Sequence, residues 1–261
     1  FLRFPETFSR FEVFRSKRLI KGTAKRAARI ITGSNYSKQD IIRTYGLDAG
    51  SVSVIPYGIS PSYKPIVNTK EIEAICAKYG LRTPYILTVG RLNPRKNFQN
   101  LVRAYVRLKE TRSIPHDLVI VGRDDYQARK IIRSIRESEG GKQIRFTGFV
   151  PDVELPLLYG AADVFVYPSL FEGVGLPAFE AMGCGVPVVA SNTTSLKEIV
   201  GESGVLVDPL DSRAIAEGLE SLLFDKKKRE LMISRGLARA QDFSREECAR
   251  RTLSIYREIG S

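Results

Sequence analysis

The sequence predicts an α/β fold built on a doubly wound parallel sheet, and two observations support this. First, short runs of β-branched and aromatic residues recur, nearly continuous in apolar character, as is typical of strands buried on both faces of a sheet. Second, segments with apolar residues at helical spacing separate most of these runs. This alternation predicts helices on both faces and right-handed crossovers. The expected strands span residues 85–90, 117–122, 143–149, 163–169, 187–191 and 204–208.

Apolar positions identify several helices with a single buried face. The segment after the first of these strands and the segment after the last both keep such a face, and so does the end of the chain, at residues 244–259. The three faces consist, in order, of Phe98, Leu101, Val102, Tyr105 and Leu108; of Ile215, Leu219, Leu222 and Leu223; and of Cys248, Thr252, Ile255 and Ile259.

The first part of the chain differs from the rest. It predicts a strand at Arg29–Gly33, a helix at Ser37–Tyr45 and a strand at Val52–Ile55, and then a proline-rich connector. This is too little to complete an α/β domain. We therefore expect three parts: the tail end of another domain with its linker (residues 1–58), a Rossmann-like domain (59–240) and a terminal helix (241–261).

Composition and charge restrict the function. The 261 residues are 43% apolar and 27% charged, which is ordinary for a globular protein. No apolar run is long enough for a transmembrane helix. Three separated cysteines and one histidine, His116, argue against a Cys/His zinc site. His116 precedes an expected strand, and we interpret it as a surface residue. The net charge of +12 permits nucleic acid, an anionic membrane or a phosphorylated ligand.

A glycine-containing loop follows the expected strand at 163–169. Ligands of open parallel sheets bind beyond the carboxyl ends of the strands, so this loop lies at the ligand edge. Gly173 and Gly175 allow a close approach of the backbone. A helix over about Pro177–Met182 would direct its free N–H groups toward the loop. A helix start of this kind binds phosphate.

Charged residues surround this loop. Glu172 precedes the glycines and Glu180 lies about one turn into the helix. Carboxylates only accept hydrogen bonds, so a pair of them suits a hydroxyl-rich ligand. Arg91 and Lys96 follow the first sheet strand and could hold phosphate oxygens. We assign Arg95, beside Lys96, to solvent.

Four segments together resemble one enzyme family. The stretch "EGVGLPAFEAMGCGVPVVAS" resembles the signature of family 4 glycosyltransferases, retaining enzymes of the two-domain GT-B fold. "YILTVGRLNPRKNFQNLVRAY" resembles their first strand and phosphate-binding loop. "RIITGSNYSKQDIIRTYGL" with "VSVIPYGIS" resembles the passage between the two domains, and "FSREECARRTLSIYREI" the helix that crosses back. The overall likeness is to mannosyltransferase-like members.

The resemblance implies roles for individual residues. Glu172 would contact the donor sugar and stabilise the transition state, and Glu180 would bind the ribose hydroxyls. Arg91 and Lys96 would stabilise the departing diphosphate, and backbone amides after Glu172 would bind sugar and phosphates. Glu172, Arg91 and Lys96 are thus the expected catalytic residues, with no metal. The full expected donor site is Gly90, Arg91, Lys96, Phe149, Val150, Glu172, Gly173, Val174, Gly175, Leu176 and Glu180.

The sequence departs from the family pattern in three places. Val174 stands where an aromatic residue is common, and "VGRDDY" (121–126) replaces a common Gly-x-Gly. A catalytic histidine of the N-terminal domain would fall before Phe1. We therefore expect the chain to be a fragment of an enzyme roughly 100 residues longer, with its N-terminal acceptor domain largely missing, and to be inactive alone.

The function we expect is transfer of a hexose from a nucleotide diphosphate sugar to a glycan or lipid-linked acceptor. GDP-mannose is the first expected donor. A glucosyltransferase, a glycogen-synthase-like enzyme using UDP- or ADP-glucose and a nucleotide-sugar epimerase are alternatives. We expect a cytoplasmic protein, and the basic start of the chain suggests a peripheral contact with an anionic inner membrane face. From another class, a nucleic-acid-binding protein or a non-catalytic nucleotide-binding module stays open, although the sequence has neither an RNA-binding aromatic strand motif nor a zinc finger.

Overall fold

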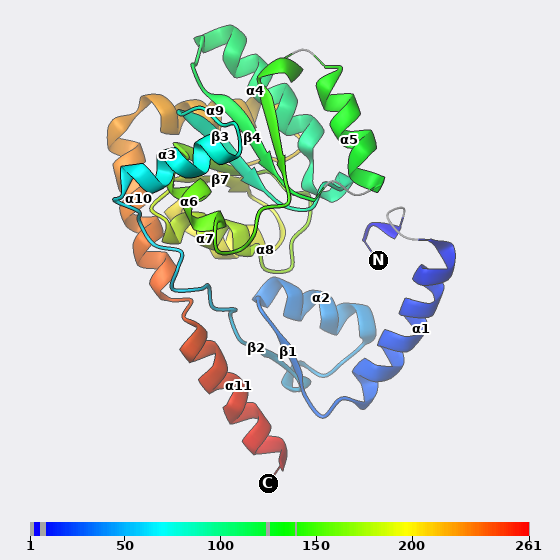
Figure 1. The fold of residues 1–261 in the computed structure, drawn as a ribbon. Coiled ribbons are helices and arrows are strands. Elements are labelled where there is room, and N and C mark those ends of the chain that lie inside the picture. Colours follow the sequence, from blue (N-terminus) through cyan, green and yellow to red (C-terminus); the bar gives the residue numbers. More distant parts are fainter. Residues whose placement is uncertain (1–2, 6–8, 124–125, 139, 261) are drawn as a thin grey trace.

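The computed structural model describes residues 3–5, 9–123, 126–138 and 140–260. Figure 1 shows a larger lobe built around a six-stranded sheet and a smaller lobe beneath it that holds β1, β2, α1 and α2. All strand pairs of the large sheet are parallel. The prediction of a doubly wound α/β domain is therefore confirmed.

The six expected sheet strands are present within one or two residues of their predicted limits. Their order across the sheet is β5-β4-β3-β6-β7-β8, so the order reverses between β3 and β6. This reversal is the switch point at which open α/β sheets bind ligands. The strands are β3 (Tyr85–Val89), β4 (Asp117–Val121), β5 (Ile144–Gly148), β6 (Val164–Tyr167), β7 (Val188–Ser191) and β8 (Val205–Val207).

Helices cover both faces of the sheet, because alternate strand residues enter two different cores. Tyr85 and Leu87 of β3 belong to one core, and Ile86 between them belongs to the other. The helices that pack on the first core are α3 (Thr69–Lys78), α6 (Leu155–Gly160), α7 (Leu176–Gly183) and α8 (Thr194–Val200). The helices that pack on the second core are α4 (Phe98–Arg112), α5 (Tyr126–Arg136) and α9 (Ser212–Phe224). Helix α10 (Lys226–Gln241) contacts α7 and α9.

The smaller lobe has the predicted strand–helix–strand pattern. Its elements are α1 (Arg10–Arg26), β1 (Ile30–Thr32), α2 (Asn35–Tyr45) and β2 (Val52–Val54), and the two strands are parallel.

Short 3-10 turns of both lobes lie at Ala49–Ser51, Pro94–Lys96, Gly141–Gln143 and Gly201–Ser203.

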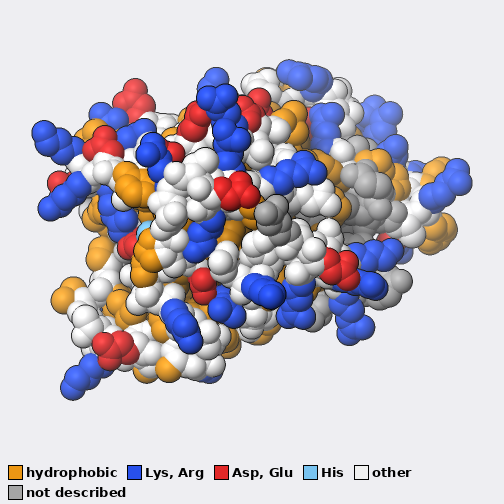
Figure 2. Space-filling view, turned by 90° about the horizontal axis from the view of Figure 1, so that it is seen from above, with side chains coloured by type: hydrophobic (Ala, Val, Ile, Leu, Met, Phe, Trp, Pro, Cys, Tyr) orange, Lys and Arg blue, Asp and Glu red, His pale blue; other side chains and the backbone are white. Residues whose placement is uncertain are grey.

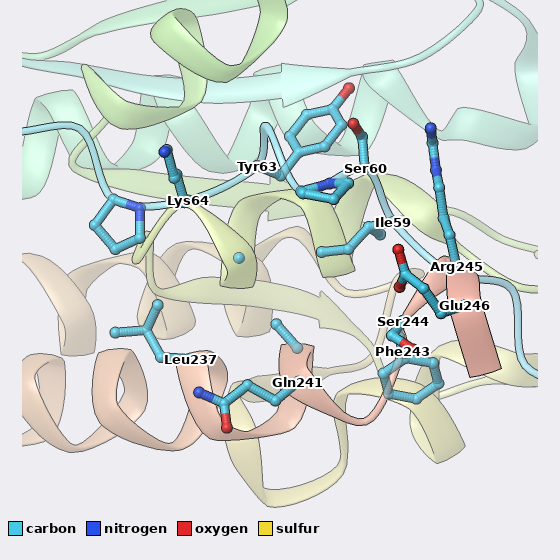
Figure 3. Close-up of a pocket in the computed structure, with 14 residues that line it drawn as sticks. Ile59, Ser60, Tyr63, Lys64, Leu237, Gln241, Phe243, Ser244, Arg245 and Glu246 are labelled. Carbon is cyan, nitrogen blue, oxygen red and sulfur yellow. The ribbon is translucent and has the colours of Figure 1, made fainter. Parts of the chain in front are cut away.

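The terminal helix α11 (Arg245–Gly260) returns from the large lobe to the small one (Figure 1). The Arg251 guanidinium donates a hydrogen bond to the Val54 carbonyl at 3.0 Å. Near its start, the Ile59 amide donates to the Phe243 carbonyl at 3.0 Å, where the linker passes the α10–α11 junction. A cavity of about 290 Å³ lies at this crossing, and Figure 3 shows Ile59, Tyr63 and Leu237 among the residues around it. The limits drawn at residues 58 and 240 stay a prediction.

On the face drawn in Figure 2, the positive charge is distributed and not confined to one patch. In the view of Figure 2, Lys and Arg side chains are spread across the visible face, with fewer acidic side chains between them. Among the helices of the described residues, none combines the length and the apolar character needed to cross a bilayer.

His116 is a buried residue, so its assignment to the surface was wrong. Its side chain Nε2 lies 2.8 Å from Oδ2 of Asp163, and Arg229 donates to the other carboxylate oxygen at 3.0 Å. His116 precedes β4 and Asp163 precedes β6, so their pairing depends on the sheet and not on sequence distance. The hydrogen bond from His116, together with Arg229, holds the pKa of Asp163 below its ordinary value although burial opposes this.

We predict that His116→Ala lowers the free energy of unfolding by about 1 kcal/mol at neutral pH, since Asp163 loses one of two partners. The folded-state pKa of Asp163 is depressed, so its contribution is present above the unfolded pKa and is lost as pH falls through the folded pKa. The difference between variant and wild type in urea unfolding should therefore shrink in acid. Ligand binding should not change, because both residues lie at the amino edge of the sheet. A difference that grows in acid would contradict this explanation.

Candidate functional site

Two loops meet at the switch point of the sheet. One follows β3 and runs through Arg91 to Asn97; the other follows β6 and runs to Gly175. The Leu170 amide donates to the Arg95 carbonyl at 2.8 Å, and the Arg95 guanidinium donates to the Phe171 carbonyl. The Asn97 side chain donates to the Pro168 carbonyl at 3.0 Å. These bonds join the two loops into one surface at the carboxyl edge of the sheet.

A carboxylate with two cations lies at the centre of this surface. Lys96 Nζ is 2.6 Å and Arg95 Nη1 is 2.8 Å from the same oxygen of Glu172. Lys96 also contacts the hydroxyl of Tyr167, the last residue of β6. Glu172 and Lys96 are both buried, with 7% and 8% of their surfaces exposed. The assignment of Arg95 to solvent was wrong, because the 3-10 turn at Pro94–Lys96 directs both of its cations toward Glu172.

Burial and charge act in opposite directions on this cluster. Burial alone would raise the pKa of Glu172, but Lys96 and Arg95 outweigh it and hold that pKa below its ordinary value. Burial lowers the pKa of Lys96, and the attraction of Glu172 opposes only part of this effect. Glu172 is thus an ionised carboxylate at neutral pH, poised to stabilise positive charge beside it.

The start of α8 fixes the backbone of Glu172. The Glu172 amide donates to Thr194 Oγ1 at 3.2 Å, and the Ser195 hydroxyl donates to the Glu172 carbonyl at 2.9 Å. Neither residue was predicted to belong to the site. They follow β7, the next strand across the sheet, and so reach the same edge; only that strand order could have indicated them.

Gly175 is required by the turn into α7. Its φ of +84° is in the left-handed region, and a Cβ there would lie 2.5 Å from the Leu196 Cδ2 atom. Glycine therefore serves both the backbone conformation and the close packing against α8. The helix begins at Leu176, one residue before the prediction, with Pro177 in its first turn.

We predict that Gly175→Ala lowers the free energy of unfolding by about 2–3 kcal/mol, from left-handed strain plus overpacking. Gly46→Ala is the matched control, because Gly46 also has a positive φ (+64°) but no heavy atom within 4 Å of the added Cβ. The control should lose only about 1 kcal/mol, from strain alone. Urea unfolding measures both, and equal losses would show that Leu196 moves away at no cost.

Glu180 lies in the second turn of α7 and is half-buried. The Tyr159 hydroxyl donates to its carboxylate at 2.8 Å. Burial raises the pKa of Glu180, and the hydrogen bond from Tyr159 opposes part of this effect. The two predicted acids thus have distinct surroundings: Glu172 is paired with cations, and Glu180 is paired with a hydroxyl. Glu180 is the better suited of the two to share hydrogen bonds with neutral hydroxyl groups.

The remaining predicted residues lie along the same edge. Gly90 is tied to β4, since its amide donates to the Val121 carbonyl at 2.9 Å, and Arg91 after it is exposed. Val150 is buried, whereas Phe149 is 56% exposed with the Arg123 guanidinium 4.8 Å from its ring centre. Asp124 and Asp125, part of the departure from the family pattern, lie outside the described residues.

No metal-binding cluster is evident in the described part of the chain, where His, Cys, Asp and Glu side chains do not gather in groups of three or more. Two of the three cysteines, Cys76 and Cys184, are buried. Burial, with a smaller effect of Glu180, raises the pKa of Cys184 to about 12, so this thiol stays protonated and serves as a packing residue.

Comparison with known proteins agrees with this geometry. The family described as "Glycosyl transferases group 1" matches residues 72–239, which is more than half of the chain. The chain belongs to this family. Its fold corresponds to part of a GT-B fold, as in the glycosyltransferase structures that it resembles.

Relatives and solved structures extend the comparison. The chain is 40% identical over 233 residues to O-antigen chain mannosyltransferase B of Escherichia coli, covering 87% of this chain and 60% of that protein. It is 31% identical over 223 residues to serotype-specific mannosyltransferase WbdA of Escherichia coli, covering 84% and 27%. The chain therefore spans less than two thirds of the length of each of these relatives.

Two solved structures have the same fold. Sucrose-phosphate synthase from Thermosynechococcus elongatus superposes with a TM-score of 0.79 at 29% identity, covering 93% of this chain and 61% of that one. Anabaena HepE, solved in complex with UDP-glucose, gives a TM-score of 0.80 at 24% identity, covering 96% and 69%; at this identity the likeness concerns the fold.

Proposed function

We propose that the chain carries the donor-binding half of a retaining mannosyltransferase that moves mannose from GDP-mannose to a glycan or lipid-linked acceptor. The observation that carries this proposal is the buried Glu172 carboxylate held against Lys96 and Arg95 at the switch point. The 40% identity to a protein named as a mannosyltransferase supports mannose as the sugar.

The proposed reaction exchanges one C–O bond for another. The bond between the anomeric carbon and the diphosphate breaks, a bond to an acceptor hydroxyl forms with the configuration retained, and the hydroxyl proton passes to the departing diphosphate. Lys96 and Arg91 would neutralise the charge that develops on the diphosphate. The structure suggests Arg95 as a third cation. Glu172 would stabilise positive charge on the sugar, without need of a metal.

The rest of the donor would lie along the same edge of the sheet. Glu180 would accept hydrogen bonds from the ribose hydroxyls. The backbone amides from Gly173 to Leu176 would bind the sugar and the phosphates, as glycine loops before helices do. The turn at Phe149 and Val150 would contact the base.

A panel of ligands tests the proposal on the 261-residue chain. We expect GDP-mannose and GDP to raise the melting temperature more than UDP-glucose, ADP-glucose or a DNA duplex at equal concentration. A ligand at a hundred times its Kd adds about 2.7 kcal/mol of stability, enough for a clear shift. A larger effect of UDP- or ADP-glucose would favour the glucosyltransferase alternative. Salt-sensitive DNA binding with no nucleotide effect would refute the proposal.

We also propose a cytoplasmic protein with a peripheral contact to an anionic membrane, made through α1. This helix has no buried residue and ends in Lys25 and Arg26, and Phe11 and Phe14 are exposed at 72% and 65%. Cations near an anionic surface add about 1 kcal/mol each, and apolar side chains can enter the interface. Co-sedimentation with phosphatidylserine vesicles, but not with phosphatidylcholine vesicles, is the expected result; equal sedimentation with both would contradict it.

A further inference from the structure

The small lobe holds the glycine loop of the large lobe through two hydroxyl groups. Ser34 Oγ donates to the Gly173 carbonyl at 2.6 Å, and Ser37 Oγ donates to the same oxygen at 2.8 Å. Ser34 is only 1% exposed. It is the N-cap of α2, and it also accepts from the Ser37 amide at 3.1 Å. Both donors lie almost 140 positions away from this carbonyl in the chain. Packing of the two lobes does not by itself require two hydroxyl groups to share one carbonyl oxygen.

A carboxylate from the large lobe holds the start of α2 in return. Glu198 of α8 accepts from the Asn35 amide at 3.0 Å, the Asn35 side chain at 2.8 Å and the Tyr36 amide at 3.1 Å. A negative charge is favourable at a helix start, where free amides and the helix dipole meet. The same helix α8 binds the backbone of Glu172 through Thr194 and Ser195. One helix thus anchors both the backbone of Glu172 and the small lobe.

The fit between the lobes at this contact leaves no spare room. A Cβ at Gly33 would lie 2.5 Å from Val174 Cγ2 and 3.3 Å from the Tyr57 ring. The backbone of Gly33 therefore packs directly against the side chain of Val174, the residue that follows Gly173.

We propose that Ser34, Ser37 and Glu198 are positioning residues that orient the Gly173–Val174 peptide for the donor. The C=O and N–H of a trans peptide point in opposite directions, and the cis peptide found among the described residues is Thr83–Pro84. The two serine hydroxyls hold the Gly173 carbonyl toward the small lobe. The Val174 amide of the same peptide must therefore point away from the small lobe, and its direction is set. This inference rests on the proposed function, in which that amide belongs to the donor site.

The contact also makes the donor loop depend on the position of the small lobe. If α2 separates from α8, the Gly173 carbonyl loses both of its donors at once, and the loop is no longer held in one orientation. The small lobe thus acts on the donor site without contributing a side chain to the reaction.

The test compares Ser34→Ala/Ser37→Ala with wild type in two measurements on the 261-residue chain. Hydrogen exchange reports the opening of the loop over residues 171–176, and calorimetry reports the affinities for GDP-mannose and GMP. We expect faster loop exchange and an affinity for GDP-mannose about tenfold lower, from two lost hydrogen bonds. GMP affinity should fall by much less, because GMP lacks the sugar and the second phosphate that the loop amides are proposed to bind.

Two further variants separate positioning from general loosening. Ser37→Thr keeps the hydroxyl and should match wild type, whereas Ser37→Ala should not. Ser221→Ala removes a hydroxyl that donates to the Gly218 carbonyl at 2.8 Å on α9, and it should change neither measurement.

Unchanged loop exchange in the double variant would overturn the inference, and so would an equal fall in GMP affinity. If wild type binds none of the nucleotide sugars, the proposed function fails. The exchange result then still decides whether the two serines order the loop.

Discussion

Replacing Glu172 with glutamine should abolish sugar transfer by the full-length gene product while leaving the affinity for GDP within about threefold. The change keeps the shape of the side chain and removes its charge. In the proposed reaction the carboxylate stabilises charge only in the transition state, so its loss should lower kcat by about a thousandfold or more. GDP carries no sugar, so its binding does not depend on this interaction.

The contacts of Glu172 make this prediction sharper. Lys96 and Arg95 are both paired with Glu172, so removing that charge leaves both cations available to phosphate. GDP binding should therefore not weaken, and a modest gain is compatible with the proposal. Protein stability should fall, because Lys96 remains buried without its partner.

Transfer of radiolabelled mannose measures the first effect, and titration calorimetry with GDP the second. Glu220→Gln is the matched control: Glu220 also pairs with an arginine, Arg112, but on the exposed surface between α4 and α9. It should change neither quantity. Loss of GDP affinity in Glu172→Gln would mean that the roles of Glu172 and Glu180 are the reverse of those proposed.

Lys96→Ala is expected to weaken GDP binding by about a hundredfold while changing guanosine binding by less than about twofold. The ammonium group would contact only phosphate, so a ligand without phosphate should not detect its loss. Burial already lowers the pKa of Lys96, and a bound diphosphate would favour its charged form. GDP affinity in wild type should therefore decline as pH rises into the range in which Lys96 deprotonates, and this decline should be absent in Lys96→Ala.

Lys78→Ala is the control for this variant, because Lys78 also pairs with a glutamate, Glu154, at 2.6 Å, but with half of its side chain exposed. Calorimetry over a pH series with GDP and guanosine makes the comparison. An equal loss for both ligands would indicate that Lys96→Ala disturbs the fold of the site instead of a phosphate contact.

The sequence alone determined the layer architecture and the edge of the sheet at which the candidate site lies. The apolar runs from Tyr85 to Val207 predict buried parallel strands because their side chains must leave water on both faces. The glycines and acids around Glu172 follow one of these strands, so their location at the carboxyl edge required no tertiary information.

The tertiary structure decided which side chains meet. The sequence could not separate Arg95 from Lys96, since adjacent residues of a loop differ in direction only once the turn is formed. His116 and Asp163, like Ser34 and Gly173, come together through the order of strands and the contact between lobes. Hydrophobic periodicity is a local property of the chain, whereas a hydrogen bond between distant residues depends on how the whole sheet is assembled. For that reason the pattern predicts the place of the site, and only the fold determines its contacts.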